Sequence, residues 1–476
     1  MNSTTTTNYS WFIWSLLVYI LLPTIIFYFV GKLVPINRAI ISLDYILLMC
    51  FANIISYRLC SFIFLFLLCL DILVSVSAAY YFNIYDFIYS VKYLSLLKID
   101  LILILLLILV LVLLGVFIIH LFKNYKRNVP TWFSISLLLI ISFCDIVNGS
   151  SQAIFITLGI NYSNGKMGKI VDEKTGKIVD ENIASSALSK LSIDVMPYYK
   201  RKNNEYIGSK VKNLFFNDIS HNFQFIKHHQ NIILVIMESF GLNIDSNNYS
   251  KILYPILELK PVYNVSINKE RFYGGTVGAE TKELLGITGV PYYYLKNNSF
   301  MDSLISVPKI LKTKGYVTFA FHGFSGLVFE RKLWWKNIGF DSSYYFEDLR
   351  KPESIIVGKA FPGISDRMII KSIKDKIEVN GYPNPYFIYL LTLNSHLPLS
   401  KNLTKVYQIS NFEDISAPQI IDSINYNILQ DLADLIKVTK NTTVFIVGDH
   451  APPFGNNFKG YYDNKYIPVI KVEPKK

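Results

Sequence analysis

The stretch from Leu101 to Leu121 reads LILILLLILVLVLLGVFIIHL and contains no Asp, Glu, Lys or Arg. A helix needs about 20 mostly apolar residues to cross the hydrocarbon core of a bilayer, and an uncharged run of this length is typical of such a helix. This feature predicts that part of the chain lies in a membrane.

Four more apolar stretches occur in the first third of the chain, which predicts about five transmembrane helices in a membrane α-helical domain over residues 1–148. The expected spans lie near Trp11–Val30, Ala39–Ser56, Cys60–Tyr80, Leu101–Leu121 and Trp132–Val147. The second and third contain Asp44 and Asp71. A carboxylate in a span is either a functional group or a structural one near the interface.

The basic loop FKNYKRN (122–128) favours the cytoplasmic side of the membrane. The fifth helix then leads outward, so we expect everything after about Asn148 to lie outside the cytoplasm. Lys92 and Lys98 would also lie outside, so the charge pattern is mixed. The spans and the loop charges predict a multi-pass membrane protein with an extracytoplasmic globular domain.

The net charge of +12 is compatible with nucleic acid, an anionic membrane surface or phosphorylated ligands. The sequence contains no recognisable nucleic-acid-binding module, so we expect no nucleic-acid partner. In a chain with membrane spans, attraction to anionic lipid explains the positive charge. The four cysteines border apolar runs, which favours small buried side chains over disulfides or a zinc site. They are Cys50, Cys60, Cys69 and Cys144.

Residues 149–230 are polar and contain the hexapeptide GKIVDE twice, at Gly168–Glu173 and Gly176–Glu181. We expect a juxtamembrane connector here. Residues 231–476 alternate short apolar strand patterns with amphipathic helices, which predicts an α/β domain with a mainly parallel central sheet. The strand signals are NIILVIM (Asn231–Met237), YVTFAF (Tyr316–Phe321), YFIYLLTL (Tyr386–Leu393) and TTVFIV (Thr442–Val447).

A residue suited to binding metal or phosphate follows each of these strands. They are Glu238, His322, His396 and the pair Asp449-His450. In open α/β sheets, ligands bind outside the carboxyl ends of the strands, so these side chains are expected at one edge. Each alone also has a structural interpretation, as an edge carboxylate, a turn or a loop histidine bonded to backbone. For the site to be absent, all of these structural interpretations would have to be true at the same edge of the sheet.

The stretch RFYGGTVGAETKELLG (Arg271–Gly286) places Thr276 where a strand becomes a helix. On its own, Thr276 is an ordinary helix N-cap. With two carboxylates and an imidazole nearby, it forms a mixed oxygen and nitrogen pocket for Mn²⁺, Zn²⁺ or Mg²⁺. Such an ion would lower the pKa of the hydroxyl and make it a nucleophile, beside a helix N-terminus that favours phosphoryl oxygens.

The chain contains, in order, MESFG (Met237–Gly241), GGTVGAETKELLG (Gly274–Gly286), FHG followed by Arg331, NSHLP (Asn394–Pro398) and VGDHAPPF (Val447–Phe454). This series resembles the motifs of the alkaline phosphatase/sulfatase superfamily, in its lipoteichoic acid synthase or membrane phosphoglycerol transferase branch. The resemblance implies one divalent metal ion, Mn²⁺ above Zn²⁺ or Mg²⁺, with Thr276 as both ligand and nucleophile. The other implied ligands are Glu238, Asp449 and His450.

The resemblance also implies that His396, His322 and Arg331 contact the phosphate or glycerol of the substrate, with His396 in proton transfer. A guanidinium suits a phosphate independently of any family. The branch usually has Trp two residues before this arginine, and here the residue is Phe329. The implied reaction transfers phosphoglycerol from phosphatidylglycerol to a cell-envelope glycan or glycolipid acceptor, through a phospho-threonine intermediate.

Three alternatives remain at this stage. Phosphoethanolamine transferases share the scaffold, but they usually have disulfides and an ESAR-like first motif, whereas this chain reads ESFG. A sulfatase-like phosphodiesterase or hydrolase is another, although no CxPSR-type motif is present. The least favoured alternative is a non-catalytic membrane protein that binds an envelope component.

Overall fold

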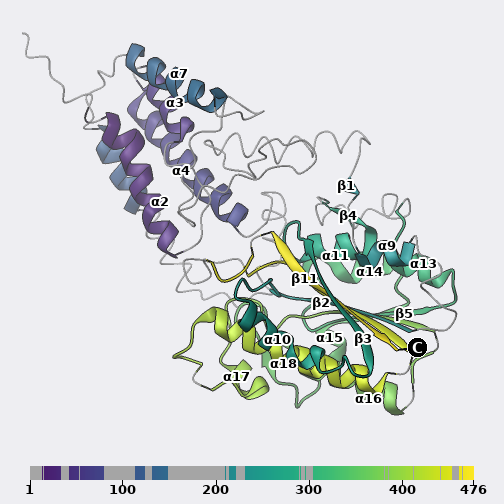
Figure 1. The fold of residues 1–476 in the computed structure, drawn as a ribbon. Helices are drawn as coiled ribbons and strands as arrows, with labels where there is room; N and C mark the ends of the chain where they lie inside the picture. Colours follow the sequence, from purple (N-terminus) through teal and green to yellow (C-terminus); the bar gives the residue numbers. More distant parts are fainter. Residues whose placement is uncertain are drawn as a thin grey trace, which may run out of the picture. The chain divides into compact units, whose positions relative to one another are not determined.

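The structure is a computed structural model, and the chain divides into two compact units, the first mostly before and the second mostly after residue 205. Each unit is described by itself (Figure 1). The structure describes residues 13, 15–33, 42–52, 54–79, 113–123, 131–147, 209–210, 214–220, 231–288, 290, 295, 304–379, 381–383, 385–410, 412–439, 441–452, 460–463 and 465–475.

The first unit is helical. Its elements are the π-helix η1 (Leu17–Leu21), α2 (Leu22–Leu33), α3 (Leu43–Phe51), α4 (Tyr57–Ala79) and α7 (Thr131–Val147), with further helix over 113–123. Tyr19, Phe64 and Phe122 meet at its core with ring centroids 5.5 to 6.3 Å apart. Asp71 accepts a hydrogen bond from the Tyr45 hydroxyl at 3.2 Å, which favours the structural interpretation of this carboxylate.

Among the described residues, α4 alone is long and apolar enough to cross a bilayer, over Tyr57–Val74, and one such helix is weak evidence. The helix α3 has nine residues, about 14 Å, so it is too short to cross by itself. Residues 101–112 of the expected fourth span lie outside the described residues. The prediction of five spans is therefore not confirmed.

The second unit contains a seven-stranded sheet in the order β3-β11-β10-β2-β9-β5-β6. The strands are β3 (Tyr263–Arg271), β11 (Tyr466–Pro474), β10 (Thr442–Gly448), β2 (Asn231–Met237), β9 (Tyr386–Leu391), β5 (Val317–His322) and β6 (Ser342–Tyr344). The pairs from β10 through β6 are parallel, whereas β11 is antiparallel to both of its neighbours. Consequently β3 runs in the same direction as β10. The predicted α/β domain with a mainly parallel sheet is confirmed.

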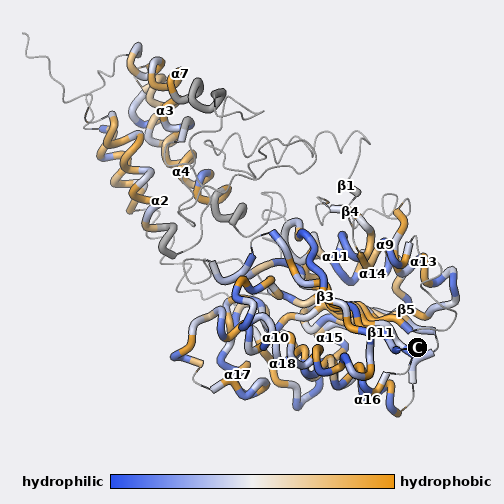
Figure 2. Tube along the Cα trace, in the orientation of Figure 1, coloured by the Kyte–Doolittle hydropathy of each residue, from blue (hydrophilic) through white to orange (hydrophobic). Residues whose placement is uncertain are grey.

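Helices cover both faces of this sheet (Figure 1). One face is covered by α10 (Ser246–Leu257), α16 (Asp366–Val379), α17 (Asn402–Tyr407) and α18 (Ala417–Val438), and the other by α9 (Leu214–Ser220), α11 (Thr276–Leu285), α13 (Val307–Lys312) and α14 (Arg331–Asn337). All seven residues of β2 are buried, as a strand covered on both sides requires. In Figure 2 the central strands are accordingly orange, while the covering helices mix orange and blue.

The minor elements are β1 (Ser209–Lys210), β4 (Ile287–Thr288), η4 (Val328–Glu330), α15 (Phe346–Leu349), β7 (Ile356–Val357) and β8 (Gly363–Ile364). The helix α9 falls within the predicted connector, yet its Phe215 is fully buried against Phe387 of β9 and Phe445 of β10. The GKIVDE repeat lies outside the described residues, and the predicted domain boundaries stay predictions.

We predict that Phe215→Ala lowers the free energy of unfolding of the α/β unit by about 3–5 kcal/mol, because it leaves a cavity between α9 and the sheet. Chemical denaturation of the purified protein measures this change. The control is Val262→Ala, whose side chain is 64% exposed and whose loss should cost less than about 0.5 kcal/mol. Equal effects of the two substitutions would contradict the burial of α9 on the sheet.

Candidate active site

Two acidic side chains meet at the carboxyl ends of the neighbouring parallel strands β2 and β10. The register pairs Met237 with Gly448, so the next residues, Glu238 and Asp449, leave the sheet side by side. A Cβ at Gly448 would lie 2.1 Å from the carbonyl oxygen of Phe240, so only glycine permits the two turns to approach this closely. Both carboxylates are buried, with 4% and 1% of their surface exposed.

Thr276 reaches the same edge from β3. The N-cap of α11 is Gly275, and Thr276 is the first helical residue, so the N-cap interpretation of Thr276 is wrong. Its hydroxyl Oγ1 instead lies 3.2 Å from Oε2 of Glu238 and 3.0 Å from Oδ2 of Asp449. The amide N–H groups of the first turn of α11 are at the same place, because Thr276 begins the helix.

The donors and acceptors of this cluster fit a cation. The Thr276 hydroxyl carries one hydrogen, so it can satisfy only one of the two carboxylate oxygens beside it. Asp449 uses Oδ1 to accept from the backbone N–H groups of Ser239 and His450 at 2.8 and 2.6 Å, which leaves Oδ2 for the cluster.

The imidazole of His450 completes the cluster. Its Nδ1 lies 2.9 Å from the carbonyl oxygen of Ala451 and therefore carries the proton, since a carbonyl only accepts. When the ring is neutral, the lone pair of Nε2 faces Oδ2 of Asp449 at 3.2 Å and Oε1 of Glu238 at 3.7 Å. One ligand atom from each of these three residues lies within 4.8 Å of the others. A backbone carbonyl that fixes the ring of a histidine is typical of metal sites.

The pKa values of the two carboxyls are driven apart. Burial and the nearby charge of Glu238 raise the pKa of Asp449 well above its usual value. Burial also works to raise the pKa of Glu238, but the imidazoles of His396 and His450 and the hydroxyls of Ser239 and Thr276 lower it overall. Two buried carboxylates this close cannot both be charged without a compensating positive charge. A divalent cation bound at this cluster would supply that charge.

His322 is the last residue of β5 and has 3% of its surface exposed. Its Nδ1 lies 3.1 Å from the carbonyl oxygen of Leu391, so Nδ1 carries the proton and Nε2 is left as an acceptor. Burial and then the positive charge of Arg331 lower the pKa of this imidazole well below its usual value. The ring is therefore neutral at physiological pH.

Arg331 begins α14 and is 3% exposed. Its guanidinium binds the carboxylate of Glu280 on α11, with Nε and Nη2 at 3.0 and 2.8 Å from Oε2. The Phe329 ring centroid lies 5.2 Å from the same guanidinium. Sequence reasoning missed the partnership with Glu280. The signal available in the sequence was Glu280 itself, an acidic residue one helical turn after Thr276 in a helix expected to pack on the sheet.

His396 lies in the loop after β9 and is partly buried. Its Nδ1 is 2.6 Å from the carbonyl oxygen of Leu397, and its ring centroid is 4.2 Å from that of Phe361. No hydrogen bond joins the side chains of His396 and Thr276, both of which the structure describes. Its imidazole is one of the groups that lower the pKa of Glu238.

A fully buried carboxylate that sequence reasoning also missed holds this loop. Asp366, at the start of α16, accepts from the backbone N–H groups of Leu393 and Asn394 at 3.0 and 2.8 Å. In return, the side-chain oxygen of Asn394 accepts from the N–H of Asp366 at 2.9 Å and the hydroxyl of Tyr407 at 2.6 Å. The loop that carries His396 is thereby fixed to α16 and α17.

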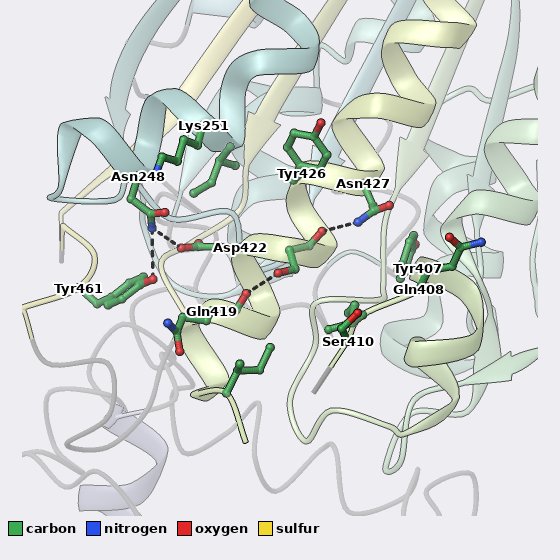
Figure 3. A pocket seen from close by; sticks show the side chains of 14 residues that line it. Asn248, Lys251, Tyr407, Gln408, Ser410, Gln419, Asp422, Tyr426, Asn427 and Tyr461 are labelled. Atoms are coloured by element: carbon green, nitrogen blue, oxygen red, sulfur yellow. Dashed lines mark hydrogen bonds between the residues drawn. The ribbon is translucent and has the colours of Figure 1, made fainter. Parts of the chain in front are cut away.

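A polar pocket of about 480 Å³ lies between α10, α18 and Tyr461, and none of the cluster residues lines it (Figure 3). Several of its polar groups bond one another: the amide of Asn248 donates to Asp422 and to Tyr461 at 2.8 and 3.2 Å. The amide of Asn427 donates to the carbonyl oxygen of Ser423 at 2.8 Å. Because these groups already have partners, the cluster at the strand ends is the better candidate site.

A mainly parallel α/β sandwich whose strand ends bring together a helix-start hydroxyl, two carboxylates and an imidazole defines an enzyme of the alkaline phosphatase/sulfatase superfamily. The sulfatase family model matches residues 230–469, half of the chain. The chain belongs to the sulfatase family.

Curated relatives match the same half. The chain is similar to lipoteichoic acid synthase 2 of Bacillus subtilis, 26% identical over 250 residues, which is 49% of this chain and 37% of the relative. It is also similar to a putative cyclic beta-1,2-glucan modification protein of Rhizobium meliloti, 22% identical over 259 residues, 51% of this chain and 39% of the relative. The chain thus spans less than two-fifths of the length of these relatives.

Among solved structures, the chain is similar to the lipoteichoic acid synthase LtaP from Listeria monocytogenes. The identity is 18%, the match covers 55% of this chain and 71% of the other, and the TM-score is 0.41.

We predict that Asp449→Asn abolishes binding of Mn²⁺, because the amide cannot supply the negative charge that balances the ion. Metal content by mass spectrometry and the rise of Tm on adding Mn²⁺ measure this. The matched control is Asp422→Asn, which changes a buried carboxylate of the polar pocket and should retain the metal. Full metal content in Asp449→Asn would rule out the cluster as the metal site.

Burial raises the pKa of Asp366 to about 7, so the folded protein holds a proton that the unfolded chain has released. The folded state is therefore stabilised below the unfolded pKa of Asp366, about 4, and loses that stability as pH rises to about 7. We predict that Asp366→Asn removes this loss. The Tm of the variant minus that of the unsubstituted protein should increase from pH 4 to 7 and then level off.

The control for this pH dependence is Asp341→Asn. Burial works to raise the pKa of Asp341, but the hydrogen bonds from Lys312 and Thr318 lower it overall. The stability that Asp341 contributes is thus lost only below about pH 4, and the Tm difference for its variant should be flat from pH 5 to 7. Parallel curves for Asp366→Asn and Asp341→Asn would contradict the raised pKa of Asp366.

Proposed function

We propose that this protein is a metal-dependent phosphotransferase that moves the phosphoglycerol headgroup of phosphatidylglycerol to a glycan or glycolipid of the cell envelope. The observation that carries the proposal is the Thr276 hydroxyl at the N-terminus of α11, within 3.2 Å of two buried carboxylates. The resemblance to lipoteichoic acid synthase 2 supports the phosphoglycerol headgroup, and the glucan-modifying relative supports a glycan acceptor.

In the proposed reaction, Glu238, Thr276, Asp449 and His450 would hold one divalent ion, which would lower the pKa of the threonine hydroxyl. Oγ1 of Thr276, ionised beforehand, attacks the phosphorus as the alkoxide, and the bond from phosphorus to the diacylglycerol oxygen breaks. The first-turn N–H groups of α11 bind the phosphoryl oxygens as their negative charge increases. An acceptor hydroxyl then attacks the phosphothreonine and regenerates Thr276.

His396 is proposed to move the protons. Its Nδ1 is held by the carbonyl oxygen of Leu397, so Nε2 is the atom left to exchange a proton. From Nε2 a proton passes to the departing diacylglycerol oxygen, and the same nitrogen later accepts the proton of the attacking acceptor hydroxyl.

His322 is proposed to bind the headgroup hydroxyl. Because Nδ1 donates to Leu391, the unprotonated Nε2 accepts a hydrogen bond, which a glycerol hydroxyl provides and an ionised phosphate oxygen does not. Phe329, where the synthase branch usually has Trp, packs on the guanidinium of Arg331. Arg331 is proposed to bind the phosphate through Nη1, to which the structure assigns no acceptor among the described residues.

The mixed oxygen and nitrogen donors favour Mn²⁺, with Zn²⁺ and Mg²⁺ as alternatives. The apolar helices, of which α4 has the length of a span, are proposed to anchor the enzyme in a bacterial plasma membrane with the α/β unit outside the cytoplasm. Anchoring would keep the site near its lipid donor.

We predict that Thr276→Ala abolishes headgroup transfer while the protein still folds. The enzyme is incubated with phosphatidylglycerol and phosphatidylethanolamine, each labelled in its headgroup, and mass spectrometry identifies the adduct on Thr276. Phosphoglycerol on Thr276 is the expected result. Phosphoethanolamine there would favour the other transferase class, and a folded, metal-loaded enzyme that gains no adduct would overturn the proposal. Thr276→Ser, which keeps the hydroxyl, should retain part of the activity.

A further inference from the structure

We infer that Glu280 is a positioning residue, which fixes the guanidinium of Arg331 relative to the nucleophile Thr276. The inference rests on the proposed function, since it assigns Arg331 to the phosphate of the substrate. It concerns a side chain that neither touches the substrate in the proposed reaction nor belongs to the metal cluster.

Glu280 is fully buried and accepts hydrogen bonds from three residues, which lie on two elements. Its Oε2 accepts from Nε and Nη2 of Arg331 on α14 at 3.0 and 2.8 Å. Its Oε1 accepts from Nε1 of Trp335, also on α14, at 3.0 Å and from the hydroxyl of Tyr389 on β9 at 3.2 Å. Burial and then the charge of Glu280 raise the pKa of Tyr389 well above its usual value, so this hydroxyl remains a donor.

Glu280 and Thr276 lie on the same helix, four residues apart. Residues at this spacing lie on one side of a helix, about one turn from each other. The carboxylate that holds Arg331 and the proposed nucleophile therefore belong to one rigid element. The separation between the guanidinium and the hydroxyl is set by α11 and not by the loop before α14.

That loop needs such an anchor. Phe329 and Glu330, immediately before Arg331, have φ values of 54° and 55°, which are uncommon for residues with a side chain. A strained backbone of this kind persists only where its surroundings fix it. The hydrogen bonds from Nε and Nη2 to Glu280 fix the plane of the guanidinium, and Nη1 is the nitrogen that they leave for a ligand.

The competing explanation is a purely structural ion pair. A buried ion pair contributes little net stability compared with apolar packing, so stability alone does not explain its presence here. The two explanations predict different binding. Loss of a structural pair lowers Tm and leaves ligand affinity per folded molecule unchanged, whereas loss of positioning weakens affinity for a phosphate ligand.

The experiment measures binding of sn-glycerol 1-phosphate to the Mn²⁺-loaded full-length protein by calorimetry, and kcat/KM for headgroup transfer. For Glu280→Gln we expect the Kd to rise about tenfold and kcat/KM to fall about 10- to 100-fold, the scale of a misplaced binding group. The substitution makes the site more positive, so a purely electrostatic role predicts tighter binding. Unchanged or tighter binding would overturn the inference.

A double-mutant cycle tests whether Glu280 acts through Arg331. In the background of Arg331→Gln, adding Glu280→Gln should change neither the Kd nor kcat/KM further, because the positioned group is already lost. Additive losses would overturn the inference.

The matched control is Glu283→Gln on the same helix, which removes a buried carboxylate paired with Lys282 at 3.0 Å. It should lower Tm and leave the Kd per folded molecule unchanged, and a Kd raised as much as in Glu280→Gln would overturn the inference.

If the unsubstituted protein binds glycerol phosphate but transfers no headgroup, the proposed function fails. The Kd values measured by calorimetry still decide the role of Glu280. If it transfers the headgroup and Glu280→Gln does so equally well, only the inference about Glu280 fails. A protein that neither binds nor transfers contradicts both.

Discussion

The repulsion between the buried carboxylates of Glu238 and Asp449 is the constraint on which the rest of this site depends. They directly follow two adjacent parallel strands, and both reach the hydroxyl of Thr276. Burial weakens screening by water, so holding both charges together is unfavourable unless a positive charge lies between them. The neighbouring Nε2 of His450 presents a lone pair, which makes a bound cation the consistent solution.

The fold supplies this constraint through strand direction. Although β11 is antiparallel, it lies between β10 and β3 and restores the direction of β3, so that the chain after β3 arrives at the same edge as Glu238 and Asp449. If β11 were parallel to β10 and still antiparallel to β3, then β3 would run in the opposite direction. Thr276 would then lie at the opposite edge of the sheet from Glu238 and Asp449. Close contacts at Gly448 then bring the turns together.

Much of this arrangement could be predicted from the sequence because it depends on local patterns. NIILVIM is a continuous apolar run, which is typical of a strand buried on both faces. The strand β2 has the predicted bounds, and all of its residues are buried. The partnership of Arg331 with Glu280 could not be predicted, since it joins residues far apart in the chain through α11 and α14. Asp366 was missed for the same reason. The expected span Ala39–Ser56 failed as a single long helix because hydropathy does not report where a helix ends, here at Phe51.

The charges of the proposed site balance in two separate groups. A divalent ion offsets Glu238 and Asp449, and Glu280 offsets Arg331, while His322 stays neutral because burial lowers its pKa. In the proposed reaction, a phosphodiester would therefore enter a site with almost no net charge and would not be held tightly by attraction alone. As negative charge increases on the phosphoryl oxygens during the proposed transfer, the ion, Arg331 and the start of α11 would stabilise it more than they stabilise the substrate. Interactions that strengthen in the transition state raise the rate of the chemical step, whereas uniform binding does not.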